Sequence, residues 1–399
     1  MRSNNFSRGN KHYSPRPQNG HTKRGPKKQY INPARFINHN VVEQLVEEYV
    51  SSRSFESFGL NQRILQNIAE LGYVTPSAIQ ERTIPLAMSG KDVVGLANTG
   101  TGKTAAFLLP IIDQLFESRT PYSVLIMAPT RELAQQIDAE FKNFARGMKL
   151  FSALLVGGAS IQRQIRELAR RPHVIIGTPG RMKDLIQRKQ LHLYDVKNLV
   201  LDEADRMLDM GFVNDIKAII SELALDHQTL SFSATMTPAV ERITKEIMKQ
   251  PEMVSVVNSE TNDHIFQDVV RFTDPDNKRE LLINMLNEEE FAKVVVFGET
   301  KFGVQRLADM LIAQGISAAA IHGNKSQSQR ERALKQFKNH EVDVLVATDV
   351  AARGLDISDI SHVINYDLPN KYEDYVHRIG RTGRAGKTGK AFTFIESQR

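Results

Sequence analysis

The 399-residue chain contains no cysteine, so disulfide bonds, thiolate metal sites and cysteine nucleophiles are excluded. It also has no uncharged apolar run near the roughly 18 to 20 residues that a membrane-spanning helix needs. The first thirty residues hold no apolar stretch that could serve as a secretory signal. We therefore expect an intracellular, cytoplasmic protein that does not enter a membrane.

Acidic residues are absent from the first forty positions, which hold nine of the 52 Lys and Arg residues. The rest of the chain has 43 basic against 46 acidic residues, so the positive charge belongs to the N-terminal segment. Residues 1 to about 30 have almost no aliphatic side chains, and burial therefore cannot offset the entropy of ordering them. We predict a disordered basic tail over residues 1–40. It is either a solubilising leader or presequence, or an arm that binds phosphates through counterion release.

The length predicts two or three domains at about 150 residues each. From residue 51 on, short β-rich apolar runs alternate with longer helical patterns, which is typical of βαβ units and a mostly parallel sheet. Two such series occur, and the polar stretch Asn258–Asp263 separates them. The predicted fold class is α/β with two tandem parallel-sheet domains at 41–257 and 266–399, joined by a short linker at 258–265.

Individual strands and helices can also be placed from the apolar runs. The expected strands are Asp92–Leu96, Ser123–Ala128, Phe151–Val156, Val174–Gly177, Leu199–Leu201, Thr229–Phe232, Val269–Phe272, Val294–Phe297, Ala318–Ile321, Val344–Ala347, His362–Tyr366 and Ala391–Ile395. Helical patterns cover Glu132–Arg146 and Pro238–Lys249, and apolar spacing within residues 31–50 suits a short lead-in helix.

A glycine-rich segment, Ala97–Thr104, follows one expected strand and precedes a helical pattern. Glycines let successive backbone N–H groups curl around phosphate at a helix N-terminus. Ala97 stands where this P-loop pattern usually has its first glycine. We expect Lys103 at the β- and γ-phosphates of a nucleoside triphosphate and the Thr104 hydroxyl on Mg²⁺, rather than an ordinary glycine-rich turn. The candidate nucleotide-binding residues here are Ala97, Thr99, Gly100, Thr101, Gly102, Lys103 and Thr104.

Acidic residues follow another expected strand, in Asp202-Glu203-Ala204-Asp205. Alone, they could be a helix start that the helix dipole stabilises. With a P-loop about 100 residues earlier, we expect Asp202 to hold Mg²⁺ and Glu203 to orient or deprotonate an attacking water. The two segments together predict a site that hydrolyses a nucleoside triphosphate.

Three arginines recur at three-residue intervals in His377–Arg384, beside two glycines. The planar guanidinium suits phosphate, and an arginine finger accelerates phosphoryl transfer by roughly 10³- to 10⁵-fold. An isolated segment of this kind would more often be a solvated surface or an RNA-contact loop. Because it lies in the other half of the chain from the P-loop, we predict a composite site that closes when the two halves meet.

In this order, the motifs resemble those of DEAD-box ATP-dependent RNA helicases over residues 51–399. The resemblance implies two RecA-like domains and RNA-stimulated ATP hydrolysis, coupled to local strand separation of short RNA duplexes or to remodelling of RNA–protein complexes. The alternative is an ATP-gated RNA clamp with little unwinding. The sequence of Leu208–Phe212 resembles that of the bacterial RhlE-like subgroup. Only fifteen residues follow Arg384, so we expect no C-terminal RNA-recognition module.

The resemblance also implies roles for individual residues. Gln80 would read the adenine edge and Phe55 would stack on the ring, which implies ATP. Arg381 and Arg384 would lie at the γ-phosphate, and Asp356 at the ribose. The residues expected to contact RNA are Thr130, Arg131, Gly158, Thr178, Arg181, Gln327, Arg330 and Thr348. Those expected to couple the ATP and RNA sites are Asp205, Ser233, Thr235, His377 and Arg378.

The predicted RNA contacts are hydroxyls, backbone amides and arginines, which suit phosphate and sugar rather than base edges. The expected partner is therefore RNA bound without sequence preference. Ribosomal or RNA-decay complexes are candidate assemblies, and we expect a monomer.

Overall fold

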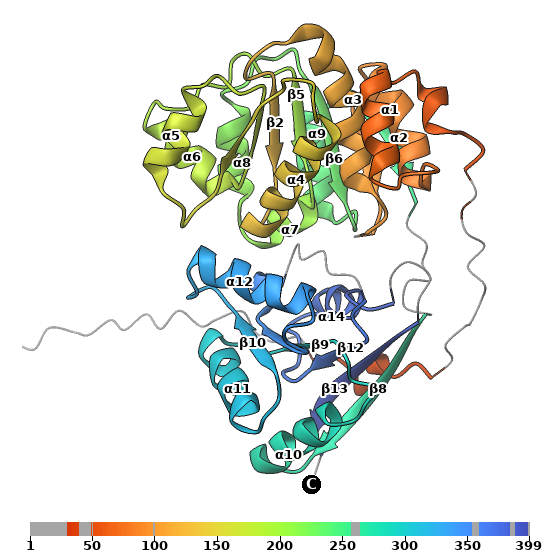
Figure 1. The fold of residues 1–399 in the computed structure, drawn as a ribbon, viewed down its shortest axis with the longest axis vertical. Helices are drawn as coiled ribbons and strands as arrows, with labels where there is room; N and C mark the ends of the chain where they lie inside the picture. The colour runs from red at the N-terminus through yellow and green to blue at the C-terminus, as the bar shows by residue number, and fades with distance from the viewer. Residues whose placement is uncertain are drawn as a thin grey trace, which may run out of the picture.

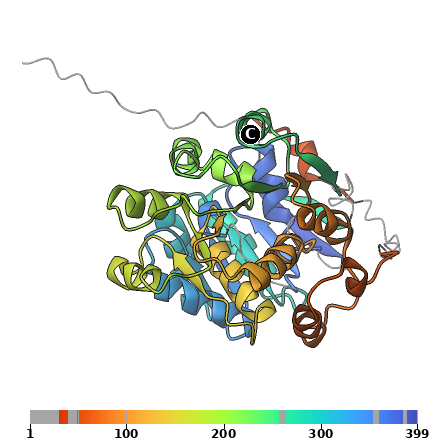
Figure 2. The same cartoon turned by 90° about the horizontal axis from the view of Figure 1, so that it is seen from above.

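The computed structural model describes residues 30–39, 49, 51–98, 100–256, 264–352, 359–383 and 388–397. Two α/β domains lie one above the other along the long axis (Figure 1) and overlap when viewed from above (Figure 2). Each domain is built on one parallel sheet with helices on both faces. The predicted α/β class with two parallel sheets is confirmed.

The first domain has a seven-stranded sheet in the order β3-β4-β2-β5-β6-β1-β7 within the described residues. Its strands are β1 (Val93–Leu96), β2 (Val124–Met127), β3 (Ser152–Leu155), β4 (Val174–Gly177), β5 (Asn198–Leu201), β6 (Gln228–Ser233) and β7 (Glu252–Ser255). Its helices are η2 (Phe55–Phe58), α1 (Gln62–Glu70), α2 (Ala78–Met88), α3 (Lys103–Ser118), α4 (Arg131–Phe144), α5 (Ile161–Leu168), α6 (Pro179–Gln187), α7 (Ala204–Asp209), α8 (Val213–Ile220) and α9 (Pro238–Ile247).

The second domain has a six-stranded sheet in the order β10-β11-β9-β12-β13-β8, again among the described residues. Its strands are β8 (Ile265–Phe272), β9 (Val294–Phe297), β10 (Ala318–Ile321), β11 (Val344–Ala347), β12 (His362–Asn365) and β13 (Gly389–Glu396). Its helices are α10 (Pro275–Leu286), α11 (Lys301–Ala313), α12 (Gln327–Lys338), α13 (Asp349–Ala352) and α14 (Tyr372–Ile379).

Central strands such as β2, β4 and β5 are buried along their whole length, because helices cover both faces of the sheet. Four apolar clusters result, one on each face of each sheet. In parallel sheets the carboxyl ends of the strands meet at one edge, where ligands usually bind. The P-loop follows β1, and the acidic segment at Asp202 follows β5, so both open onto the same edge of the first sheet.

All twelve predicted strands are present, and one further strand, β7, was not predicted. Only Val254 of β7 is buried, since this edge strand pairs on one side alone, with β1. A four-residue run with one inward side chain carries too little apolar periodicity to be recognised. β8 begins at Ile265 rather than at the predicted Val269, inside the segment predicted as linker.

Residues 30–39, which the sequence places in a disordered tail, instead pack against the second domain. Asn32 caps the short 3-10 helix η1 (Pro33–Phe36) by accepting a hydrogen bond from the backbone N–H of Ala34. Phe36 is 1% exposed and belongs to the apolar cluster beneath α14. Its burial stabilises this packing by about 2–3 kcal/mol, which local composition could not reveal because the contacting residues lie more than 200 positions away.

Other predicted features fall outside the described residues. These are the tail at 1–29, most of the lead-in helix within 31–50, and the polar linker at 258–263. Among the described residues, no helix combines the length and the apolar character needed to cross a bilayer.

Candidate active site at the domain interface

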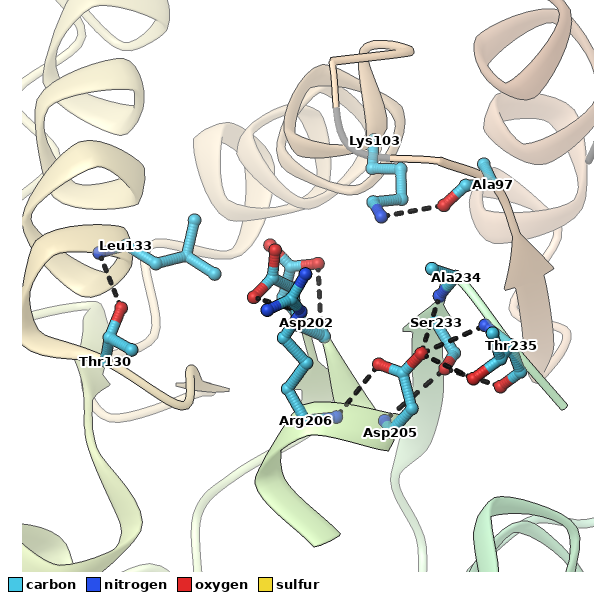
Figure 3. A network of polar contacts seen from close by, with 11 residues as sticks. Ala97, Lys103, Thr130, Leu133, Asp202, Asp205, Arg206, Ser233, Ala234 and Thr235 are labelled. Carbon is cyan, nitrogen blue, oxygen red and sulfur yellow. Dashed lines mark hydrogen bonds and ion pairs between the residues drawn. The ribbon is translucent and has the colours of Figure 1, made fainter. Parts of the chain in front are cut away.

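The P-loop encloses the side chain of Lys103, the first residue of α3. Lys103 is 7% exposed, and its Nζ donates to the carbonyl oxygen of Ala97 at 2.8 Å (Figure 3). Gly102 has a φ of +91°, and a Cβ there would lie 2.3 Å from Nε2 of Gln80. The left-handed φ therefore favours glycine at this turn, and a Cβ would also displace the Gln80 amide. The Thr101 hydroxyl donates to the carbonyl of Asn98, and Gly100 and Thr104 line the adjoining cavity.

Gln80 links α2 to the P-loop. Its Oε1 accepts from the N–H of Ser77, and its Nε2 donates to the carbonyl of Gly102 at 3.0 Å. Each amide atom keeps a second hydrogen-bonding position for a base edge. Phe55 is 2% exposed and packs edge-on against Phe58 and Tyr73, so it contributes to the core of the first domain in this structure.

A cavity of about 210 Å³ lies between the P-loop and the ends of β5 and α4, and Lys103, Thr104, Asp202 and Glu203 line it. Asp202 is 2% exposed. Burial raises its pKa to about 7, although the positive charge of Lys103 lowers it. Glu203 has a left-handed φ of 51°, which is unfavourable for a residue with a side chain. Its Oε2 is buried without a hydrogen-bond partner, since Nε of Arg206 lies 3.6 Å away.

Asp202→Asn is expected to stabilise the nucleotide-free protein, and more at pH 8 than at pH 5. The pKa of Asp202 is raised on folding from 3.8 to about 7, so the neutral acid is favoured in the fold and stability is lost as pH rises towards 7. Asparagine removes this loss, which is at most about 4 kcal/mol. Urea unfolding at both pH values measures the effect, and an equal gain at both would contradict it.

Asp205 lies at the centre of a hydrogen-bond network that joins α7 to the end of β6 (Figure 3). Its Oδ2 accepts from the backbone N–H of Ala234 and from both N–H and Oγ1 of Thr235, the last at 2.8 Å. The Ser233 hydroxyl donates to the carbonyl of Thr235. Burial acts to raise the pKa of Asp205, but the Thr235 bond and the charges of Arg206 and His377 outweigh it and lower the pKa. His377 of the second domain is therefore within electrostatic reach of this network.

The arginines after α14 divide into two kinds. Arg378 is 2% exposed and pairs with both carboxylate oxygens of Asp349, at 2.6 and 2.8 Å, while its Nη1 donates to Asn365 and to the carbonyl of Asp367. Its guanidinium is thus fully engaged inside the second domain. Arg381 is 4% exposed and lines a hollow together with Arg206 of the first domain. Arg381 consequently lies where the two domains face each other.

Three of the predicted RNA-contacting arginines lie close together. Burial lowers the pKa of Arg181, Asp184 opposes the shift, and the charge of Arg131 adds to it. Burial also lowers the pKa of Arg330, where Glu132 opposes the shift and Arg131 again adds to it. Arg131 is therefore within electrostatic reach of both neighbours, and an anion would relieve its repulsion with each of them.

Smaller predicted contacts surround these arginines. Gly158 has a φ of +77°, and a Cβ there would lie 2.1 Å from Nη1 of Arg131. Thr130 is the N-cap residue of α4, and its hydroxyl accepts from the N–H of Leu133, whereas Thr178 precedes α6 without a side-chain cap. In the second domain, Thr348 follows β11 and is nearly buried.

Contacts between α4 and α12 hold the two domains together on this side. Nη2 of Arg330 lies 2.8 Å from Oε1 of Glu132, and both side chains are nearly buried. Gln327 donates to Oε1 of Gln135 at 3.1 Å. The predicted RNA-contacting residues of both domains are therefore adjacent.

Some site residues fall outside the described part of the chain, and others were not predicted. Thr99, Asp356 and Arg384 belong to the first group. The unpredicted residues are Arg206, Glu132, Gln135 and Asp349, each a partner of a predicted one. Glu132 directly follows the predicted RNA-contacting residue Arg131, and Asp349 directly follows Thr348, so adjacency in the sequence was the signal that could have identified them.

Two family models match the chain: the DEAD/DEAH box helicase model over residues 77–243 and the helicase conserved C-terminal domain over 277–386. ATP-dependent RNA helicase CshA of Limosilactobacillus reuteri is 46% identical over 86% of this chain and 69% of its own length. DEAD-box ATP-dependent RNA helicase CshA of Streptococcus pneumoniae is 47% identical over 86% of this chain and 65% of its own length. The chain thus spans about two thirds of these relatives. Their name is CshA, so the resemblance of Leu208–Phe212 to the RhlE-like subgroup is not supported.

Solved structures agree with the family models. Saccharomyces cerevisiae Dbp5 bound to RNA and ADP BeF3 has a TM-score of 0.77 at 32% identity, covering 87% of this chain and 90% of its own. Mss116p bound to single-stranded RNA and AMP-PNP has a TM-score of 0.79 at 32% identity, covering 88% of this chain and 77% of its own. Both likenesses extend over the two domains together, and the names of the relatives favour a helicase over the clamp alternative.

Proposed function

Because the chain belongs to the family of DEAD-box ATP-dependent RNA helicases, we propose that it hydrolyses ATP in response to RNA and uses this to separate short RNA duplexes or remodel RNA–protein complexes. One observation carries the proposal. Lys103, Asp202 and Glu203 line a cavity in the first domain, while Arg381 of the second domain shares a hollow with Arg206 of the first. The residues proposed to bind the triphosphate therefore belong to the first domain, and the arginine proposed to stabilise the transition state belongs to the second.

In the hydrolysis step, a water oxygen forms a bond to the γ-phosphorus of ATP as the bond to the bridging oxygen of ADP breaks. We assign Glu203 to orient this water and accept its proton, since Oε2 is buried and has no hydrogen-bond donor. Lys103 balances charge on the β- and γ-phosphates, and Gln80 selects adenine by reading its edge. Phe55, which is 2% exposed in this structure, would have to turn out of the core to stack on the adenine ring. Arg381, with Arg384, stabilises the charge that develops on the γ-phosphate.

The residues at the cavity fit a magnesium ion. The buried carboxylate Asp202 lines the same cavity as Thr104, and no cluster of three or more His, Asp or Glu side chains suited to a metal occurs among the described residues. Mg²⁺ typically takes one or two protein ligands and completes its shell with water and phosphate oxygens. Asp202 and Thr104 would hold it, and it would neutralise phosphate charge.

The RNA site in this proposal is the arginine cluster formed by Arg131, Arg181 and Arg330, with the helix starts at Thr130 and Thr178. Guanidinium groups and helix N-termini bind phosphates without reading bases. The charge of His377 acts on Asp205 across the interface, so the Asp205 network would couple closure of the two domains to the ATP site. We further propose a monomer that acts in the cytoplasm on ribosomal or RNA-decay complexes.

The direct test of the function is ATP turnover with and without RNA. Closure that needs both ligands makes their binding mutually favourable, by a coupling of about 5- to 150-fold. We expect saturating single-stranded RNA to raise turnover by at least about tenfold, and ATP analogues to tighten RNA binding. Duplex DNA of the same sequence serves as the control. Equal turnover in the presence and absence of RNA would overturn the proposal.

Deleting residues 1–29 is expected to weaken RNA binding while RNA-saturated turnover stays unchanged. This deletion removes eight basic residues and keeps the packed segment 30–39. The slope of log Kd against log salt should become shallower by about 0.7 for each phosphate that the tail no longer neutralises. A control variant keeps the tail but replaces its eight basic residues by Gln, and should behave like the deletion. An unchanged salt slope in both would make the tail a leader only.

A further inference from the structure

Residues 30–39 precede the first domain in the chain, yet they pack on the second (Figure 1). Asn38 and Gln267 of β8 exchange two backbone hydrogen bonds in an antiparallel bridge, at 2.8 and 2.9 Å. The next residue, His39, stacks on Phe266 with ring centroids 5.1 Å apart, and its Nε2 lies 3.3 Å from Asp268. The segment is therefore fixed to an edge strand of the second sheet.

Residues 30–39 also pack against α14. Phe36 packs edge-on against Tyr375 with ring centroids 4.7 Å apart, and the guanidinium of Arg35 lies 3.5 Å above the ring of Tyr372. Tyr375 is fully buried and donates its hydroxyl to Gln267 at 2.9 Å. Residues 30–39 are thus held on the second domain by an aromatic pair, a cation–π contact and a strand bridge.

The chain is fixed again on the first domain only ten positions later. Oη of Tyr49 donates to Oε2 of Glu81 in α2 at 2.7 Å, and the hydroxyl of Ser51 also donates to this carboxylate. Ser52 donates to the other carboxylate oxygen at 3.0 Å. Nine residues, 40–48, join the two attachment points.

We propose that residues 30–39 are a strap that, with residues 40–48, ties the second domain to the first a second time and limits how far the two domains can separate. Ten peptide steps span at most about 35 Å when fully extended. While both ends of the strap stay docked, the distance between His39 and Tyr49 therefore cannot exceed about 35 Å.

The strap and the interdomain linker start and end at neighbouring places. The linker follows β7, and Arg82 of α2, next to Glu81, donates to the carbonyl of Ser255 at the end of β7. At its other end the linker leads into β8, and β8 is also the strand to which Asn38 of the strap is bridged. Because the described attachment points of both connections are neighbours on each domain, the two connections together act as a hinge that restricts twisting as well as opening.

This hinge has a consequence for ligand binding, which rests on the proposed function. A second connection raises the effective concentration of one domain at the surface of the other. Closure on ATP and RNA then costs less entropy, so both bind at lower concentration. The chemistry in the closed state is unchanged, because the strap contacts α14 on the side of Tyr372 and Tyr375 while His377, Arg378 and Arg381 face the interface hollow.

The test separates docking from tether length. One variant loses docking through Arg35→Ala and Phe36→Ala, with Phe36→Leu as its conservative counterpart. A second keeps docking but lengthens the tether by about twenty Gly and Ser residues between Leu45 and Val46. A matched control carries the same insertion after Gly20, where it lengthens no tether. Dyes at Arg242→Cys and Glu280→Cys report the interdomain distance by single-molecule energy transfer, since the chain has no other cysteine.

We expect the distance distribution of the ligand-free protein to broaden in the docking-loss and tether variants, and to stay unchanged in the Phe36→Leu and Gly20 controls. The concentrations of ATP and RNA at half-maximal turnover should rise about fivefold, with saturated turnover retained. An unchanged distance distribution in the tether variant would overturn the proposal. So would a change confined to the docking-loss variant, because the segment would then only support the packing of α14. The distance readout needs no ATP hydrolysis, so its failure is distinct from failure of the proposed function.

Discussion

Replacing Lys103 by Ala is expected to lower RNA-stimulated ATP turnover by at least about 10²- to 10³-fold, the effect of removing a preorganised charge from a site that excludes water. Lys103 is nearly buried, and its charge already acts on Asp202, whose pKa it lowers. No other lysine lines the cavity, so within the described residues nothing replaces it. ATP binding should weaken as well, because phosphate charge is unbalanced in the ground state too. Steady-state turnover and nucleotide binding measure both effects.

The control for this variant is Lys245→Ala. Lys245 is an exposed lysine of α9 that pairs with Glu241 one helical turn away. Such surface pairs contribute little, so turnover should stay within about twofold of the native value. Native thermal unfolding of Lys103→Ala would show that the loss is local. Turnover near the native level in a folded Lys103→Ala protein would remove the P-loop from the mechanism.

Arg381→Ala is expected to lower saturated turnover by about 10³-fold while changing ATP affinity much less. Arg381 belongs to the second domain and lines a hollow with Arg206 of the first. In the proposed mechanism it meets the nucleotide only on closure, so it would act on the transition state more than on the bound ground state. Measuring turnover against ATP concentration at saturating RNA separates the two parameters. An exposed arginine of the same domain, Arg271→Ala, should leave both unchanged.

The contrary outcome for Arg381→Ala is a higher ATP requirement with normal saturated turnover. That result would make Arg381 a binding residue in the open protein. Arg378 does not serve as a substitute test, because its paired contacts with Asp349 hold the second domain together. Its loss would leave the partly buried carboxylate of Asp349 without this partner and would confuse a catalytic effect with a folding effect.

The central strands could be predicted from the sequence because each is a short apolar run buried on both faces. Val124–Met127 and Val174–Gly177 need no knowledge of their neighbours to be recognised. The β7 strand and the packed segment around Phe36 could not be predicted. Each depends on one inward side chain whose partner lies far along the chain.

The nucleotide site could be predicted for a related reason. The P-loop and the acidic segment at Asp202 are each contiguous, and a parallel sheet brings strand ends together at one edge. The residues that pair across the interface were missed. Glu132 opposes Arg330 only because α4 meets α12, and Arg206 faces Arg381 only because α7 meets α14. The spacing of residues along the sequence does not predict these contacts between the two domains.

A crystal structure of the complex with a non-hydrolysable ATP analogue, Mg²⁺ and a short single-stranded RNA tests the central claim most directly. We predict that the guanidinium groups of Arg381 and Arg384 lie within hydrogen-bonding distance of the γ-phosphate oxygens, opposite Nζ of Lys103. If Lys103 binds the phosphates and both arginines remain remote from them, the two-domain site proposed here is contradicted.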